Sequence, residues 1–328
     1  MINSITDVPG VEVGHAQDAD ALTGCTVILT RKGAVAGGDQ RGGAPGTRET
    51  DLLSPVNLVS KIHGLLLSGG SAFGLDAATG VMRYLDEQGI GFDTGAAKVP
   101  IVPGAVLFDL AFGSANVRPD AEMGYQAAQA ATDDDAQVGN VGAGMGATVG
   151  KIFGMGGAMK AGLGTASIDI GGGVIVGAIV AVNAFGDVIN PQTGTILAGA
   201  RPAQVGPVTV GGDGEFANTL DVMKSLPGRT IMKMATRANT VIGAVATNAK
   251  LTKAEAGRVA MMAQDGLART IRPAHTMLDG DTIFAISTGS KKADVSTLGA
   301  FAAEALAQAI LRGTQSAQSL GGLPGLGK

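Results

Sequence analysis

The sequence contains few of the residues that build metal sites, disulfides and aromatic cores. Its 328 residues include one cysteine, three histidines, two tyrosines and no tryptophan. A lone cysteine excludes an intrachain disulfide, and Cys25 lies in an apolar run typical of a buried strand. The histidines His15, His63 and His275 form no zinc-binding pattern. We therefore expect a protein without a zinc site, in a reducing compartment such as the cytoplasm.

Strong net charge and long apolar runs are also missing. The net charge of −4, with no long basic run, argues against nucleic acid or an anionic membrane as the main partner. The longest uncharged run, between Asp169 and Asp187, is too short and too rich in glycine to span a bilayer. Glycine is abundant instead, with 53 residues, and 45% of the residues are hydrophobic. These features predict a soluble protein with a closely packed aliphatic core.

Short apolar runs alternate with amphipathic segments along most of the chain. The runs predict strands, and apolar residues three and four positions apart predict helices. A capping box, Thr252-Lys-Ala-Glu255, begins one of the helices. The predicted strands are 25–30, 63–68, 99–102, 105–110, 174–182, 240–247 and 282–288, and the predicted helices are roughly 71–86, roughly 119–131, one from Thr252 and one from about 297. This alternation predicts a layered α/β or α+β fold.

Two stretches lack clear periodicity. Residues 199–236 carry three prolines and predict a long connector across the surface, and residues 320–328 predict a mobile tail. Neither stretch is a flexible linker between two self-sufficient halves. The chain is therefore expected to form one domain, 1–328.

Two glycine-rich motifs fall short of the patterns that they suggest. In Gly69-Gly-Ser-Ala-Phe-Gly74 the second glycine comes one position too late for a nucleophile elbow, which favours Ser71 as a helix N-cap. The stretch Gly142–Lys151 lacks the spacing of a phosphate-binding loop, and Ile152 replaces the hydroxyl that binds magnesium. A non-enzymatic nucleotide-binding module therefore stays a minor alternative.

Asn239-Thr240, at the start of a predicted strand, offers nucleophilic chemistry that needs no metal. A threonine hydroxyl is a poor nucleophile unless a base lies beside it. The α-amino group of an N-terminal threonine supplies that base, with a pKa of about 7.7–8.0. An internal threonine reaches this state when its hydroxyl attacks the preceding carbonyl and the resulting ester is hydrolysed. By itself, an Asn-Thr pair at a strand start is more simply the exit of a turn.

Five segments, in order along nearly the whole chain, match one known family. They are Ile5-Thr-Asp-Val-Pro-Gly-Val-Glu-Val-Gly14, Arg41-Gly-Gly-Ala-Pro-Gly-Thr-Arg-Glu-Thr-Asp51, Leu67-Ser-Gly-Gly-Ser-Ala-Phe-Gly-Leu75, Asn239-Thr-Val-Ile-Gly-Ala-Val-Ala-Thr-Asn248 and His275-Thr-Met-Leu-Asp-Gly-Asp-Thr-Ile-Phe-Ala285. Through them the chain resembles the DmpA-type N-terminal-nucleophile peptidases, which include L-aminopeptidase/D-amidase-esterases, β-peptidyl aminopeptidases and nylon-oligomer endo-hydrolases.

The resemblance implies an αββα sandwich that cleaves itself into a large chain, 1–239, and a small chain, 240–328, which stay together. It also implies a homo-oligomer, here expected to be a tetramer, and a small peptide or amide substrate. No metal or organic cofactor is expected.

The resemblance assigns roles to individual residues. Thr240 falls at the position of the nucleophile, and Asn239 lies on the acyl side of the cleaved bond. Asp279 and Asp281 match an acidic pair that would orient the Thr240 amine, and two positions apart in extended backbone they would point to one side. Without the family, Asp279-Gly-Asp281 is more simply a turn before the next strand.

Asn183 and Lys151 match active-site residues that would stabilise the oxyanion, and Lys151 could also lower the pKa of the amine. Their simpler interpretations are a strand cap and a surface lysine. Phe108 stands where related enzymes have a tyrosine, so any hydrogen bond from that hydroxyl is absent, and Phe108 either walls the pocket or packs in the core. Arg41 and Arg48 lie in the second matched segment and either bind a substrate carboxylate or brace their loop.

Together these observations favour an amide-bond hydrolase of the N-terminal threonine type. Aminopeptidase action on short peptides or amino-acid amides is the expected activity. Endo-hydrolysis of ω-amino-acid oligomers is the nearest alternative, and acyl transfer to an amine, as in ornithine acetyltransferases, is a further one.

Overall fold

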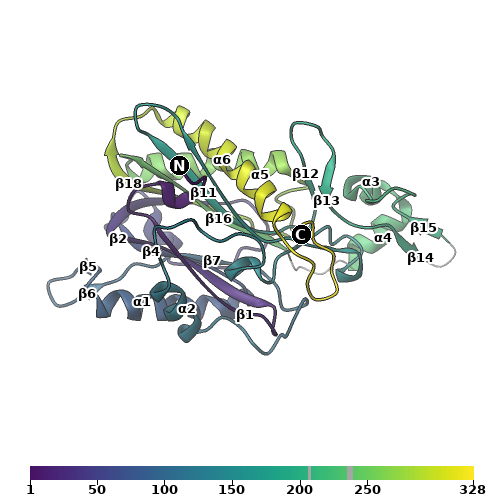
Figure 1. Ribbon diagram of the computed structural model, residues 1–328, viewed down its shortest axis with the longest axis horizontal. Helices are drawn as coiled ribbons and strands as arrows, with labels where there is room; N and C mark the ends of the chain where they lie inside the picture. The colour runs from purple at the N-terminus through teal and green to yellow at the C-terminus, as the bar shows by residue number, and fades with distance from the viewer. Residues whose placement is uncertain (206–207, 235–238) are drawn as a thin grey trace.

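Two layers of β-strands lie face to face, and each is covered on its outer side by a pair of helices (Figure 1). This arrangement comes from a computed structural model that describes residues 1–205, 208–234 and 239–328. The four layers confirm the predicted αββα architecture.

The first layer contains β10 (Leu163–Asp169), β11 (Ile175–Asn183), β16 (Thr240–Ala249) and β18 (Thr282–Lys291). Helices α5 (Lys253–Thr270) and α6 (Val295–Gln315) cover it. The second layer contains β1 (Glu12–Asp18), β2 (Thr23–Gln40), β3 (Thr47–Arg48), β4 (Ile62–Ser68) and β7 (Gly104–Val106). Helices α1 (Ala77–Glu87) and α2 (Ala121–Gln129) cover it.

Strand β2 is long enough to belong to both layers. Its first part pairs with β1 and β4, and its last part, from Val35 to Gln40, pairs with β18. The hydrogen-bonded order is therefore continuous, β10-β11-β16-β18-β2-β4-β7-β3, with β1 on the free side of the first part of β2.

Alternation along β16 explains why this strand lies in the middle of the molecule. Val241 and Val245 pack in the cluster beneath α5 and α6, whereas Ile242 and Ala244 pack in the core between the two strand layers. Successive side chains of a strand point to opposite faces, so a strand buried on both faces needs a continuous apolar sequence. Every residue of β16 is buried.

Smaller elements complete the fold. Short strand pairs are formed by β5 (Phe92–Asp93) with β6 (Lys98–Val99), by β8 (Thr148–Val149) with β9 (Met159–Lys160), and by β12 (Asp187–Ile189) with β13 (Ile196–Ala198) and β17 (Ile271–Arg272). Single 3-10 turns are η1 (Ile5–Asp7), η2 (Thr50–Leu53), η3 (Ser71–Asp76), η4 (Gly142–Gly144) and η5 (Met155–Gly157).

The predicted helix at 71–86 differs from the structure at its start. Residues Ser71–Asp76 form the 3-10 turn η3, and the α-helix begins only at Ala77. The N-cap of the 3-10 turn is Gly70 in the left-handed conformation, and Ser71 itself has a φ of 54°. The prediction that Ser71 caps this helix is therefore wrong.

The segment predicted as an irregular connector folds into a small lobe, seen at the right of Figure 1. It contains β14 (Ala203–Val205), β15 (Val208–Val210), α3 (Thr219–Lys224) and α4 (Leu226–Met234). Val210 and Val222 of the lobe pack in an apolar cluster with Phe185, which lies outside the lobe, just after β11. The connector prediction is wrong over 199–205 and 208–234, and its residues 206–207 and 235–236 lie outside the described part of the chain.

The C-terminal residues are also ordered, in contrast to the predicted mobile tail. The carbonyl of Pro324 accepts a hydrogen bond from Lys160 N at 2.8 Å, and Gly327 N donates to Ala317 O at 2.8 Å. Leu323 is buried. The absence of helical periodicity in this segment did not imply the absence of tertiary contacts.

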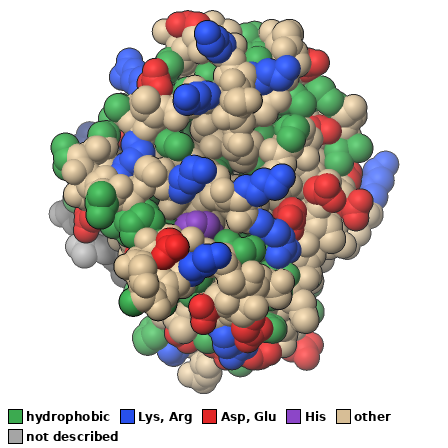
Figure 2. All heavy atoms as spheres, turned by 90° about the vertical axis from the view of Figure 1, so that its left-hand side faces the viewer, with side chains coloured by type: hydrophobic (Ala, Val, Ile, Leu, Met, Phe, Trp, Pro, Cys, Tyr) green, Lys and Arg blue, Asp and Glu red, His purple; other side chains and the backbone are tan. Residues whose placement is uncertain are grey.

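The surface gives two further observations. On the described part of the face shown in Figure 2, Lys and Arg side chains are interspersed with Asp and Glu, and hydrophobic side chains lie in small groups. Over the described residues, no helix combines the length and apolar character needed to cross a membrane.

Candidate active site

Three strand ends meet at Thr240. Strand β11 runs antiparallel to β16, and its last residue, Asn183, lies opposite Thr240. Strand β18 runs parallel to β16, with Thr282 opposite Ile242, so residues 279–281 lie beside Thr240. Parallel neighbours begin at the same edge of a sheet, which is why segments distant in sequence converge here.

The bond between Asn239 and Thr240 is buried and polarised. Thr240 is 4% exposed and Asn239 is 3% exposed. The Thr240 hydroxyl donates to the carbonyl oxygen of Asn239, and Gly280 N donates to the same oxygen at 3.1 Å. A backbone N–H directed at this oxygen stabilises negative charge that develops on it. The hydroxyl and the carbonyl that it would attack are therefore already together.

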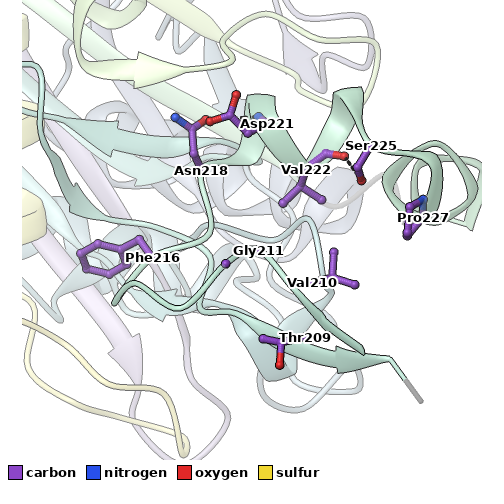
Figure 3. A pocket seen from close by; sticks show the side chains of 10 residues that line it. Thr209, Val210, Gly211, Phe216, Asn218, Asp221, Val222, Ser225 and Pro227 are labelled. Carbon is purple, nitrogen blue, oxygen red and sulfur yellow. Dashed lines mark hydrogen bonds between the residues drawn. The ribbon is translucent and has the colours of Figure 1, made fainter. Parts of the chain in front are cut away.

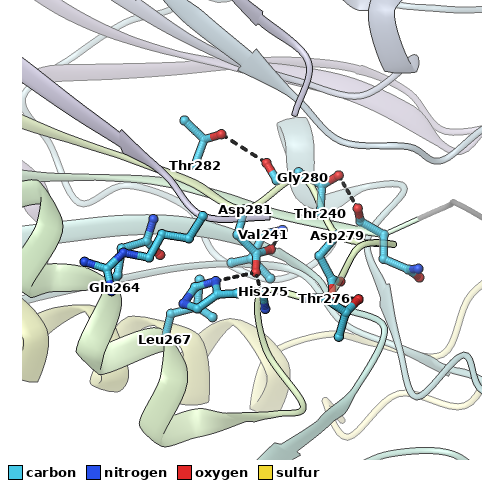
Figure 4. A network of polar contacts seen from close by, with 12 residues as sticks. Thr240, Val241, Gln264, Leu267, His275, Thr276, Asp279, Gly280, Asp281 and Thr282 are labelled. Carbon is cyan, nitrogen blue, oxygen red and sulfur yellow. Dashed lines mark hydrogen bonds and ion pairs between the residues drawn. The ribbon is translucent and has the colours of Figure 1, made fainter. Parts of the chain in front are cut away.

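Asp281 ties the start of β16 to the loop before β18 (Figure 4). Its Oδ1 accepts a hydrogen bond from Val241 N at 2.8 Å, and its Oδ2 accepts from His275 N at 3.1 Å. The ring atom His275 Nδ1 lies 2.9 Å from the same Oδ2. The carboxylate thus lies directly beside the residue that follows Thr240.

Asp279 lies in the same network with different partners. Its Oδ1 accepts from Phe185 N at 3.3 Å, and its Oδ2 accepts from Thr276 N at 3.0 Å and from the Thr276 hydroxyl at 2.5 Å. Burial and then the neighbouring charge of Asp281 raise the pKa of Asp279 to about 6. The acidic pair is therefore more than a turn, because its carboxylates connect the ends of β11, β16 and β18.

Lys151 and Asn183 are in direct contact. Lys151 Nζ donates to Asn183 Oδ1 at 2.6 Å and to the Asn183 carbonyl at 3.2 Å. Asn183 Nδ2 donates to the carbonyl of Phe108 at 3.0 Å. Lys151 is 7% exposed, so its interpretation as a surface lysine is wrong. Burial lowers the pKa of Lys151 to about 7, whereas the negative charges of Asp279 and Asp109 act to raise it.

The remaining candidates from the sequence are Phe108, Arg41 and Arg48. Phe108 contributes its backbone carbonyl, and its side chain is half-buried. Arg41 Nε donates to Asp39 at 2.7 Å, and its Nη2 donates to Met261 O at 3.0 Å. Arg48 donates to Thr79 Oγ1 at 3.4 Å and to the sulfur of Met82 at 3.0 Å. Both arginines thus brace their loop against helices, as one of the two alternatives predicted.

That loop in turn supports the acidic pair. Arg41 N donates to Asp281 O at 3.0 Å, and Ala44 N donates to Asp279 O at 2.8 Å. A Cβ at Gly42 would lie 2.2 Å from Asp279 O, so only glycine permits this approach. The glycines of the second matched segment therefore bring two backbones into contact behind the site.

A separate cavity of about 550 Å³ lies in the lobe, between β15 and helix α3 (Figure 3). Its lining includes Val210, Phe216 and Val222, and it contains none of the candidate active-site residues. The acidic side chain there, Asp221, already pairs with Lys224 at 3.2 Å. Within the described ranges, no group of three or more His, Cys, Asp and Glu side chains is arranged to hold a metal ion.

Sequence reasoning missed several residues of this network. They are the Gly280 amide, His275 and Thr276 beside the acidic pair, and Thr148 and Asp109 near Lys151. His275, Thr276 and Gly280 stood inside a matched segment, which was the available signal. Nothing in the sequence pattern indicated Thr148 or Asp109, because their contacts are tertiary.

The chain is similar to known peptidases over nearly its whole length. The model of peptidase family S58 matches residues 3–326. An uncharacterized aminopeptidase of Mycobacterium leprae is 46% identical, over 98% of this chain and 93% of the relative. A 6-aminohexanoate-oligomer endohydrolase of an Agromyces species is 31% identical, over 93% of this chain and 84% of the relative.

The structure of an L-aminopeptidase D-Ala-esterase/amidase from Ochrobactrum anthropi is similar in fold. Its TM-score is 0.72 with 18% sequence identity, over 98% of this chain and 88% of the other. That structure is described as a variant of the Ntn hydrolase fold. The similarity agrees with the αββα layers found here.

The raised pKa of Asp279 predicts a pH-dependent contribution to stability. A folded-state pKa of about 6, above the unfolded value of about 3.9, means that the folded form binds an extra proton between these values. Relative to Asp279→Asn, the chain with Asp279 should therefore gain about 1 kcal/mol of unfolding free energy as the pH falls from 7 to 5.

The measurement is denaturant unfolding of both proteins in a Thr240→Ala background, which keeps one continuous chain. A difference between the two proteins that stays constant over this pH range would contradict the raised pKa.

Proposed function

The chain belongs to peptidase family S58, as its motifs predicted, and we propose that this hydrolase cleaves itself before Thr240 and then uses Thr240 as its nucleophile. The proposed activity is that of an aminopeptidase on short peptides and amino-acid amides. One observation carries the proposal: the buried Thr240 hydroxyl lies against the Asn239 carbonyl, whose oxygen also accepts the Gly280 N–H.

Self-cleavage follows from this arrangement in two steps. Thr240 Oγ1 attacks the Asn239 carbonyl carbon while the Gly280 N–H stabilises the oxyanion. The hydroxyl proton passes to the peptide nitrogen of Thr240, and the C–N bond breaks so that this nitrogen leaves as an amine. This exchange converts the peptide bond into an ester between Asn239 and the Thr240 side chain. Water then hydrolyses the ester, which gives a carboxylate at Asn239 and a free hydroxyl and amine at Thr240.

In the mature protein the new amine becomes the general base for substrate. An α-amino group has a pKa of about 7.7–8.0, so at neutral pH a useful fraction is unprotonated. Asp279 and Asp281 orient the amine and stabilise it when it is protonated. Asn183 Nδ2 and Lys151 stabilise the oxyanion of the substrate, with Nδ2 donating the second of its two N–H groups while the first stays on the Phe108 carbonyl.

The sheet explains why the two chains would stay together after cleavage. The small chain would supply β16, β18, α5 and α6, and β16 pairs with β11 of the large chain over eight residue positions. Strand β18 pairs with β2 on its other side. Cutting before Thr240 breaks none of these ladders, so separation would require unfolding of the sheet.

A second candidate, endo-hydrolysis of ω-amino-acid oligomers, is favoured by the 31% identity with the Agromyces endohydrolase across nearly the whole chain. The same nucleophile would serve both activities, and the substrate cleft would decide between them.

The first prediction concerns the nucleophile. Purified protein should separate under denaturing conditions into chains of 239 and 89 residues, with Thr240 at the new N-terminus, and should elute as one species under native conditions. Thr240→Ala should remain whole and inactive because the hydroxyl is missing. Thr247→Ala, on the same strand, should still cleave. A wild-type protein that hydrolyses substrate while entirely uncleaved would overturn the proposal.

The second prediction concerns Gly280. A Cβ at this position would lie 2.5 Å from Ala44 O and 3.0 Å from Thr240 Oγ1, so Gly280→Ala must shift the N–H away from the Asn239 oxygen. Self-cleavage should slow about 100-fold, as expected for loss of one oxyanion donor.

The control is Gly257→Ala on helix α5, where an added Cβ meets nothing within 4 Å. Time courses of cleavage by mass spectrometry compare the two variants. Equal rates for Gly280→Ala and the wild type would rule out the Gly280 amide as the donor.

The third prediction separates the two candidate activities. Aminoacyl p-nitroanilides require exo-action on a free amino terminus, whereas an acetylated oligomer of 6-aminohexanoate offers only internal bonds. We expect hydrolysis of the former and little of the latter, measured with the same cleaved preparation. The reverse order of rates would favour the endo-hydrolase.

A further inference from the structure

Lys160 is a fully buried lysine whose ammonium group is hydrogen-bonded to backbone carbonyls. It is 0% exposed, and its Nζ donates to Gly144 O at 2.8 Å, to Ala147 O at 3.0 Å and to Ala161 O at 2.5 Å. Three acceptors match the three donors of an ammonium group, whereas a neutral amine has only two. The cradle therefore favours the charged form, against the burial that lowers the pKa of Lys160.

The counter-charge is nearby but does not touch it. Asp109 is buried, and its carboxylate accepts from neutral donors, the Thr23 hydroxyl and Gly70 N, each at 2.7 Å. Its negative charge raises the pKa of Lys160 through space. A Cβ at Gly146 would lie 2.4 Å from Asp109, so the segment between the two charges has no room for a side chain there.

Two of the three carbonyls that bind Lys160, those of Gly144 and Ala147, belong to the glycine-rich stretch 142–150. In a phosphate-binding loop, backbone N–H groups converge on an anion. Here backbone carbonyls converge on a cation instead. The peptide groups thus point the opposite way from those of a phosphate-binding loop, and the glycine-rich stretch binds the Lys160 ammonium instead.

That stretch leads directly to the candidate oxyanion site. Ala147 immediately precedes Thr148, which pairs with Lys160 across the β8–β9 ladder. Thr148 N and Thr148 Oγ1 donate to Asn183 Oδ1 at 3.1 and 3.3 Å, beside the 2.6 Å contact from Lys151 Nζ. Three donors on Oδ1 fix the orientation of the amide, so that Nδ2 is the group left for an oxygen acceptor.

We propose that Lys160 is a positioning residue for the hydrolase reaction: its ammonium fixes the carbonyls of Gly144 and Ala147, and so holds Thr148 and Lys151 against Asn183. This role rests on the proposed function, because it acts through the oxyanion donor. Loss of the ammonium leaves Gly144 O and Ala147 O without their donor in a dry interior, and the segment must move to find another. Asn183 then loses its fixed orientation, which affects turnover more than substrate binding.

The test is a double-mutant cycle on the cleaved enzyme. Lys160→Met should lower kcat on the order of tenfold and leave KM within about twofold, because the lost contact matters only when the oxyanion forms. In an Asn183→Ala background, Lys160→Met should have almost no further effect on kcat. The control is Leu85→Ala, a core change on α1 in a cluster that contains no residue of 142–161. It should leave kcat unchanged at a temperature where it is folded.

Two outcomes would overturn the role of Lys160. One is a loss of kcat that multiplies independently of Asn183→Ala, and the other is a loss no greater than in the Leu85→Ala control. If Lys160→Met does not accumulate as folded protein, Thr148→Val tests the next link, and wild-type kcat in that variant would also overturn the proposal. Failure of the proposed function would look different, because the wild type itself would then show no amide hydrolysis.

Discussion

The register of β16 between an antiparallel and a parallel neighbour is the constraint on which the site depends. Because Asn183 pairs with Thr240 and Thr282 pairs with Ile242, the end of β11 and the loop before β18 are brought to the first residue of β16. A shift of one residue in either ladder would turn the apolar side chains of β16 to the wrong layers. Packing of both cores therefore also fixes the geometry of the proposed active site.

The interior around this point holds an unusual number of ionisable groups for so aliphatic a core. Asp279 and Asp281 accept backbone N–H groups, Lys151 binds the side chain of Asn183, and Lys160 binds three carbonyls. Each charge is satisfied by hydrogen bonds, which is the condition for burying it. In such a dry site, hydrogen bonds to a developing oxyanion are stronger than in water. The site also has no room for added atoms, because a Cβ at Gly42 or at Gly280 would collide with a backbone oxygen.

More of the fold than of the candidate site could be predicted from the sequence. Strong apolar runs predicted β4, β11 and β16, and the capping box at Thr252 predicted the start of α5. The predictions failed where partners come from distant segments: Val210 and Val222 of the lobe share an apolar cluster with Phe185, and Pro324 O accepts a hydrogen bond from Lys160 N. Thr240 and the acidic pair were assigned through matched motifs and stay predictions, whereas the contacts of the Gly280 amide and of Thr148 are tertiary and leave no local pattern.

Thr240 is proposed to form the covalent acyl-enzyme. The most direct test is mass spectrometry of the cleaved protein after acid quenching within the first turnover of an aminoacyl ester, followed by peptide mapping. The account predicts one acyl group on the peptide that begins with Thr240, on its side-chain oxygen, at a level that falls as substrate is consumed. An acyl group on another residue, such as Ser71 in its left-handed turn, with Thr240 unmodified, would contradict it.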